Sequence, residues 1–249
     1  MGERNIKAVI AYDGTDYFGW QIQPGLPTVQ GVIEEALANL LGEDSRLNAA
    51  GRTDRGVHAT GQAVNFFTRR RIPLVNLKLA LNVALPRDIF IREVSEVNPG
   101  FHARFSAKER TYRYHLGLWG EGRSPFFSRY CWYPERPLDF RAMAQSTEYL
   151  VGKHDHRAFT VRSEIGEKHT LCEIRAASWE KTPSGYSLVM MADRFLPQMV
   201  RRILAMLIDI GTQKYHPSVF HDILTRGKEA WSKPWAAPPH GLFLQHVGY

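Results

Sequence analysis

The sequence of 249 residues predicts an α+β protein, and three observations support that class. Segments with the periodicity of strands and of helices alternate along the chain. The tight turn at Pro183-Ser184-Gly185 joins two strand-like segments, so these strands must pair antiparallel, unlike the strands of a doubly wound parallel sheet. The order of elements is also loosely alike in the two halves, although no sequence repeat relates them.

In the first half, turn and cap residues bound the expected elements. Residues 6–12 alternate apolar side chains as a strand does, and they end at the turn signal Asp13-Gly14. Thr28 is the expected N-cap of a helix, and Gly42 stands where the C-terminal cap belongs. Further elements are expected at three places: a strand at 62–67, a helix at 74–83 and a strand at 89–94.

In the second half, two segments carry the clearest patterns. An expected strand at 111–116 places Tyr112 and Tyr114 on the same face, because side chains alternate along a strand. Apolar residues from Leu196 to Ile208 recur at helical spacing, which predicts an amphipathic helix ending at Gly211. The other expected elements are a helix at 138–150, hairpin strands at 170–179 and 186–191, a short helix at 217–224 and a final strand at 242–247.

Composition excludes several classes of protein. The formal net charge of +7 favours a polyanionic partner, but many basic proteins bind no nucleic acid, so charge alone does not decide. There are only two cysteines, Cys131 and Cys172, far apart and outside any CxxC pairing, so we expect neither a disulfide framework nor a thiolate zinc site. The N-terminus has no apolar signal region, and no apolar run is long enough to cross a bilayer. We therefore expect a cytoplasmic protein with no membrane attachment.

One loop combines features that suit chemistry. The segment GRTDRGVHA, from Gly51 to Ala59, places Asp54 between Arg52 and Arg55, with a glycine on each side. Neighbouring cations keep a carboxylate ionised, which suits a nucleophile or a base. A surface turn with a local ion pair would give the same pattern, so the loop alone leaves both interpretations open.

This loop and four further blocks resemble the TruA-type tRNA pseudouridine synthases. The blocks occur in family order over essentially the whole chain, and together they are far more specific than any one of them. They are Tyr12–Thr15 with Phe18–Gln21 and Thr28–Gln30, Phe101–Ala107 with Tyr112–Tyr114, Phe195–Leu196 with Met199–Arg201, and Gly241–Leu244.

The resemblance implies an activity and an architecture. The reaction is the isomerisation of uridine to pseudouridine in the anticodon stem-loop of tRNA, at nucleotides 38, 39 and 40, on a base that has left its stack. Neither a cofactor nor a metal is expected, and the working unit is a homodimer. The implied fold has two similar α/β lobes, residues 1–105 and 106–249, which share an extended mixed, largely antiparallel sheet.

The resemblance also assigns three catalytic residues. Asp54 matches the catalytic aspartate, which attacks C1′ or C6 or takes the C2′ proton; the sequence does not choose among these routes. Tyr112 matches the tyrosine that stacks on uracil and serves in proton removal from C5, whereas Tyr114 is the preferred core residue. Arg201 matches the arginine that pairs with the aspartate. A helical projection places Arg201 at the margin of the apolar stripe and Arg202 opposite it, facing solvent or phosphate.

Further residues are candidates for substrate binding. Arg52 matches an arginine that holds the flipped nucleotide or fills its gap. Leu244 is either an apolar wall of the uracil pocket or a core leucine of its strand. Arg55 and His58 are candidates for phosphate contacts. The run Arg69-Arg70-Arg71 either contacts RNA phosphates or is a solvated charged face.

Some residues depart from the family pattern. His156 stands where phenylalanine is expected, Gln198 replaces a histidine, Ala205 replaces a glycine, and Arg202 is an unusual neighbour for Arg201. None matches a catalytic position, so the departures bear on which uridines are modified. The pair His154 and His156 has no third ligand nearby, and a loop histidine pair is therefore expected instead of a metal site.

Two other classes of function remain open. A non-catalytic RNA-binding protein or tRNA chaperone explains the charge and the aromatic residues, but gives no reason for an acid inside a cationic loop. A glycosidase or nucleoside hydrolase explains the acid but needs a second catalytic carboxylate, and none is evident near Asp54.

Overall fold

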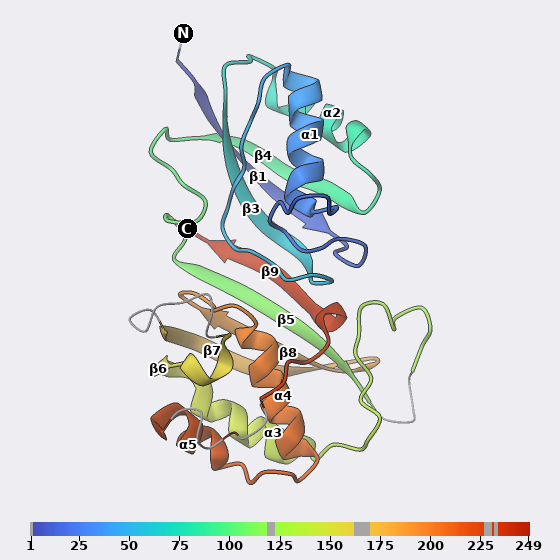
Figure 1. Ribbon diagram of the computed structural model, residues 1–249, viewed down its shortest axis with the longest axis vertical. Coiled ribbons are helices and arrows are strands. Elements are labelled where there is room, and N and C mark those ends of the chain that lie inside the picture. Colours follow the sequence, from blue (N-terminus) through green and yellow to red (C-terminus); the bar gives the residue numbers. More distant parts are fainter. Residues whose placement is uncertain (1, 119–122, 162–169, 227–230, 232–233) are drawn as a thin grey trace. The chain divides into compact units, whose positions relative to one another are not determined.

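The computed structural model describes residues 2–118, 123–161, 170–226, 231 and 234–249, and it confirms the α+β class (Figure 1). The chain divides into two compact units. One holds the residues up to Lys108 together with Phe243–Tyr249, and the other holds Glu109–Leu242. The sequence-based division between 105 and 106 lies close to the first boundary but leaves the last strand with the second half.

The first unit is a helix-covered sheet. Its strands lie in the order β4 (Ile89–Val97), β1 (Arg4–Tyr12), β3 (His58–Thr68) and β9 (Leu242–Gly248). The pairs formed by β1 are antiparallel, whereas β3 and β9 pair in parallel. A short strand, β2 (Asn48–Ala49), adds to β3, and the helices are α1 (Val29–Leu41) and α2 (Leu74–Ala84).

Local sequence signals bound these elements as predicted. The alternating residues Ile6, Ala8, Ile10 and Tyr12 are all buried. The N-cap of α1 is Thr28, whose Oγ1 accepts from the Gly31 N–H at 3.3 Å, and its C-cap is Gly42, at φ 64°. The strand expected at 62–67 is longer than predicted. It begins at His58, inside the GRTDRGVHA segment, because Ala59 pairs with Tyr12 of β1.

The second unit is an antiparallel sheet with helices packed on it. Its strands lie in the order β5 (Glu109–Gly117), β8 (Gly185–Ala192), β7 (Leu171–Thr182) and β6 (Gly152–Asp155). The predicted hairpin is therefore present, and β6 is an addition. The helices are α3 (Phe140–Thr147), α4 (Met199–Gly211) and α5 (Val219–Arg226), with single 3-10 turns at Glu148–Leu150, Arg157–Phe159 and Pro239–Gly241.

The predicted amphipathic helix, α4, is the most buried helix of this unit, and the residues of its predicted stripe are at most 6% exposed. It begins at Met199, because Gln198 takes the left-handed conformation at φ 60°. Gly211 is its last residue, as predicted, but the C-cap is Thr212 and not the glycine. A Cβ there would lie 2.6 Å from Sδ of Met143, so the glycine allows α3 to approach, while the left-handed residue after the helix is Gln213.

One departure from the family pattern lies in this core. His156 is fully buried in the loop that follows β6, as the expected loop position requires, whereas His154 lies on β6 itself. Its Nδ1–H donates to the carbonyl of His154 at 2.9 Å, while its Nε2 has no hydrogen-bond partner in the described part of the chain. Burial disfavours the charged ring and lowers the pKa of His156 to about 4.

No helix in the described ranges combines the length and the apolar character that spanning a bilayer requires.

Replacing His156 with phenylalanine, His156→Phe, should remove acid sensitivity. The ring has a pKa near 6.5 when unfolded and about 4 when folded. Above pH 6.5 the ring is neutral in both states, and the fold has its full stability. As pH falls from 6.5 toward 4, the ring is protonated in the unfolded state before the folded state, so the unfolding free energy decreases. Between pH 7 and pH 5 the wild type should lose about 2 kcal/mol of unfolding free energy through this residue, and the variant should not. Urea unfolding at both pH values measures this.

The matched control is His246→Phe, because His246 is exposed on β9. It should keep the acid sensitivity of the wild type. Equal acid sensitivity in His156→Phe and the wild type would mean that the buried ring titrates normally.

Candidate active site

The loop that carries Asp54 runs from β2 to β3 and is anchored on β3 at both ends. At its start, Ala50 N–H donates to the Ala63 carbonyl at 2.8 Å, and Gln62 Nε2 donates to the Gly51 carbonyl at 2.7 Å. Asp54 itself is half-buried, and its carbonyl accepts from Val57 N–H at 3.1 Å. Asp54 thus lies in a turn that a backbone hydrogen bond closes.

The first family block packs directly on this turn. Tyr12 OH and Thr53 Oγ1 lie 2.8 Å apart in the interior, and Trp20 N–H donates to the Thr53 carbonyl at 3.0 Å. The Arg55 guanidinium lies 4.3 Å from the centre of the Phe18 ring, in cation–π geometry. Residues on both sides of Asp54 are therefore fixed by a segment more than thirty positions earlier in the sequence.

Two glycines of that block make the contact possible. Gly19 has φ +91°, and a Cβ there would lie 2.8 Å from the Thr53 carbonyl oxygen and 3.2 Å from the Arg55 nitrogen. A Cβ on Gly14 would overlap the carbonyl of Val57. Only glycine lets backbone approach backbone this closely, so the loop is clamped before and after Asp54.

Two predicted binding residues lie beneath the loop. His58 is fully buried, its ring stacks on Phe243 at 4.6 Å, and its Nδ1 accepts from Gly14 N–H at 3.0 Å. A side chain with no exposed surface has no access to phosphate, so we reassign His58 as a structural residue. Leu244 pairs in register with Ala59 and is also buried, as either of its two predicted roles requires.

Tyr112 and Tyr114 lie in the second unit, on the same face of β5, as predicted. The ring of Tyr112 is 8% exposed and meets the ring of Phe195 edge to face at 5.0 Å. Tyr114 is fully buried, its hydroxyl donates to the Pro238 carbonyl at 2.7 Å, and burial raises the pKa of that hydroxyl well above its usual value. Tyr114 is therefore the core residue of the pair.

Arg201 is half-buried near the start of α4 and is held by a segment that the sequence did not single out. Its Nε donates to the Ala237 carbonyl at 2.7 Å, and its own carbonyl accepts from Ala237 N–H at 3.0 Å. Ala237, in the proline-rich stretch 235–239, is fully buried. Proline and small residues carry no periodic signal, so this role was not predictable from the sequence.

Arg202 was expected to face solvent or phosphate, but it is half-buried. Its Nε donates to Oε1 of Gln198 at 3.2 Å. Burial and the neighbouring charge of Arg201 lower its pKa.

The three arginines at 69–71 have different surroundings. Arg69 forms an ion pair with Glu3 at 3.2 Å, and Arg71 donates to the Gly2 carbonyl at 3.4 Å. Arg70 Nε donates to the Leu41 carbonyl at 2.6 Å, which satisfies one of the free carbonyls at the end of α1. Arg70 therefore has a helix-capping role that a charge run does not reveal.

Each unit contributes part of the predicted set of catalytic and substrate-binding residues. The first brings Asp54, Arg52 and Arg55 together on one loop, and the second holds Tyr112 and Arg201. Among the residues described, no group of three or more histidine, cysteine, aspartate or glutamate side chains is placed to hold a metal ion.

A family model described as tRNA pseudouridine synthase matches residues 8–106 and 147–249. The chain belongs to this family, as its motifs predict.

Relatives named tRNA pseudouridine synthase A match almost the whole chain. Over 248 residues, 42% are identical to tRNA pseudouridine synthase A of Moorella thermoacetica, across 98% of this chain and 99% of the relative. The enzyme of the same name from Chlorobium luteolum is also 42% identical over 248 residues, across 99% of this chain and 96% of the relative. That of Caldicellulosiruptor saccharolyticus is 39% identical over 247 residues, across 99% and 100%.

Gly19→Ala should loosen the loop that carries Asp54. The added methyl group meets the backbone at Thr53 and Arg55, so we expect the unfolding free energy to fall by about 2 kcal/mol. Hydrogen exchange at the Val57 amide, which donates to the Asp54 carbonyl, should accelerate. The control is Gly25→Ala, because Gly25 also has positive φ (+71°) but has nothing within 4 Å of its added Cβ. Equal effects of the two substitutions would show that backbone strain alone, and not the contact, is responsible.

Proposed function

We propose that this protein converts uridine to pseudouridine in the anticodon stem-loop of tRNA, at nucleotides 38, 39 and 40. The observation that carries the proposal is the fixed, half-buried position of Asp54 on a loop clamped by Gly14 and Gly19. Every route for this reaction requires a carboxylate against the flipped nucleotide, and a rigid mount keeps it in reacting geometry. The relatives' name, tRNA pseudouridine synthase A, supplies the substrate.

In the proposed reaction the N1–C1′ bond breaks, the uracil rotates, and a C5–C1′ bond forms. The proton on C5 is released to solvent, and N1 acquires one, so the product is an isomer of the substrate. Asp54 acts as an ionised carboxylate, either by attacking C1′ or C6 or by taking the proton from C2′.

We assign Tyr112 and Arg201 to the same reaction. Tyr112, whose ring is held by Phe195, would stack on the uracil and serve in removing the C5 proton. Arg201, whose Nε is fixed by the Ala237 carbonyl, would pair with Asp54. Leu244 would form an apolar wall of the uracil pocket.

Basic residues of the first unit provide the proposed contacts to RNA. Arg52 would hold the flipped nucleotide or fill the gap it leaves, and Arg55, which lies over Phe18, would contact a phosphate. Arg69 and Arg71 would add contacts through their exposed side chains, whereas the Arg70 guanidinium is already bound to α1. We further propose that the working unit is a cytoplasmic homodimer that needs no cofactor, so that one tRNA contacts both subunits.

Asp54→Ala should abolish the reaction while tRNA binding is largely retained. With tRNA tritiated at uridine C5, the wild type should release tritium into water and the variant should release none. Filter binding measures the affinity for tRNA separately. If the wild type releases no tritium from any tRNA, the protein is a non-catalytic RNA-binding protein or chaperone.

Arg201→Lys should lower kcat for tritium release about tenfold or more, because lysine cannot reproduce the guanidinium that bonds Ala237 and pairs with a carboxylate. Arg202→Lys is the matched control, since it removes the same group one residue further along α4. It should change kcat by less than about threefold. A similar loss in both variants would assign the effect to the helix and not to Arg201.

A further inference from the structure

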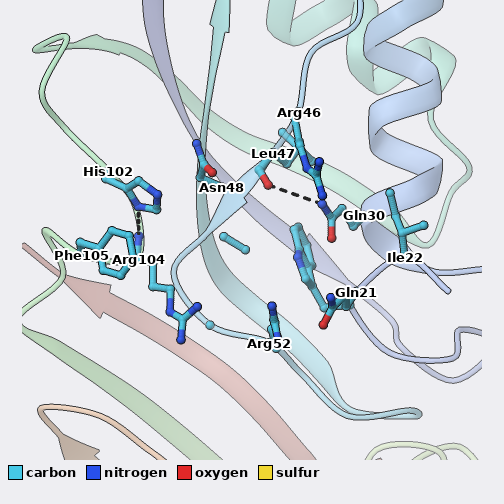
Figure 2. A pocket seen from close by; sticks show the side chains of 13 residues that line it. Gln21, Ile22, Gln30, Arg46, Leu47, Asn48, Arg52, His102, Arg104 and Phe105 are labelled. Carbon is cyan, nitrogen blue, oxygen red and sulfur yellow. Dashed lines mark hydrogen bonds between the residues drawn. The ribbon is translucent and has the colours of Figure 1, made fainter.

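A cavity of about 390 Å³ opens in the first unit beside the loop that carries Asp54 (Figure 2). Gly51 and Arg52, which precede Asp54, form part of its wall. Figure 2 shows Arg46 at one end and Arg52 and Arg104 toward the other, with His102 and Phe105 along one side. No role assigned so far uses Arg46, His102, Arg104 or Phe105.

The arginine side chains give this cavity a positive charge. Three guanidinium groups, those of Arg46, Arg52 and Arg104, line it, and among the described residues that line it none is acidic. The carboxylate of Glu34 lies behind the wall, where its Oε1 accepts from the Leu47 N–H and from Gln30 Nε2, each at 2.8 Å. A concave surface with charges of one sign concentrates the field, and arginine is the preferred partner of phosphate.

An aromatic ring stands at the side of the cavity. Phe105 is 78% exposed, an unusual position for so large an apolar side chain. One neighbour of its ring is His102, at 4.4 Å between centroids, and the Arg104 guanidinium lies 5.7 Å from its centre. Exposed aromatic rings beside cations are the usual platform on which single-stranded bases stack.

The segment that carries these side chains is rigid. Ser106 N–H donates to the His102 carbonyl at 2.9 Å, and His102 N–H donates to Ser106 Oγ at 3.1 Å. Between them, Ala103 N–H donates to buried Oδ1 of Asn65 at 2.8 Å, and the Ala103 carbonyl accepts from Tyr249 OH at 2.9 Å. Phe105 is therefore exposed on a fixed turn, so little ordering is needed when a ligand binds.

We propose that this cavity binds a nucleotide of the tRNA strand that adjoins the target uridine. Arg46 and Arg104 take its phosphates, and Phe105 stacks on its base. The volume is within the range of sites that hold one small ligand. The inference rests on the proposed function, because Arg52 lines the cavity and also stands two residues before Asp54. This site would hold the strand in register while the target is flipped.

The electrostatic part is tested with the double variant Arg46→Ala/Arg104→Ala. Affinity for tRNA, measured by filter binding at several salt concentrations, should fall about tenfold or more. The slope of log K against log salt should become less steep by about 0.7 for each phosphate that the variant no longer neutralises. The control is Arg87→Ala/Arg136→Ala, which removes the same charge from two exposed arginines that do not line the cavity. It should keep the slope of the wild type.

The stacking part is tested with Phe105→Ala. Affinity for tRNA should fall about fivefold or more, since stacking on an aromatic ring contributes on this scale. The salt slope should stay unchanged, because no charge is removed. The control is Phe90→Ala, at a phenylalanine that is 52% exposed on β4. It should bind as the wild type does.

These binding measurements are independent of tritium release, so they distinguish failure of this inference from failure of the proposed function. A protein that releases tritium but whose Arg46→Ala/Arg104→Ala variant keeps the affinity and salt slope of the wild type has no RNA site in this cavity. If uridine monophosphate binds through Arg46 and Arg104 while tRNA affinity is unaffected by the double variant, the cavity serves a free nucleotide, and the inference is wrong.

Discussion

The approach of the Gly14 and Gly19 backbones to the residues around Asp54 is the contact on which the rest of this site depends. An aspartate has a short side chain, so the position of its backbone largely determines the position of its carboxylate. Here that backbone is bounded by main-chain atoms, and Thr53 beside it is also bound by the Tyr12 hydroxyl. A fixed backbone of this kind helps to keep a reacting group in position, as catalysis requires.

Where the structure is determined by local physics, the sequence predicted it well. The alternation in β1, the Thr28 and Gly42 caps and the apolar stripe of α4 are all properties of short windows. Some features were missed, because each depends on a partner far away in sequence and leaves no periodic pattern. They are the strands β2 and β6, the hydrogen bonds between Ala237 and Arg201, and the capping of α1 by Arg70. The GRTDRGVHA motif identified the catalytic candidate, but the burial of His58 depends on Phe243 and was visible only in three dimensions.

Two of the departures from the family pattern turn out to be partners. Gln198, in the left-handed conformation, starts α4, and its side chain receives the Nε–H of Arg202. The unusual second arginine is therefore satisfied by the unusual glutamine, which explains how a half-buried cation beside Arg201 is tolerated. His156 has no comparable compensation: its Nε2 is unpaired among the described residues, and it remains neutral instead.

The parallel pairing of β3 with β9 has a consequence for how the enzyme matures. His58 and Ala59, which follow the Asp54 loop, are paired with Phe243 and Leu244, residues that leave the ribosome some 185 positions later. Closing so long a loop is slow, and until β9 has been synthesised the β3 residues that pair with it have no partner strand. The loop that carries Asp54 thus acquires this support only after Phe243 and Leu244 have been synthesised.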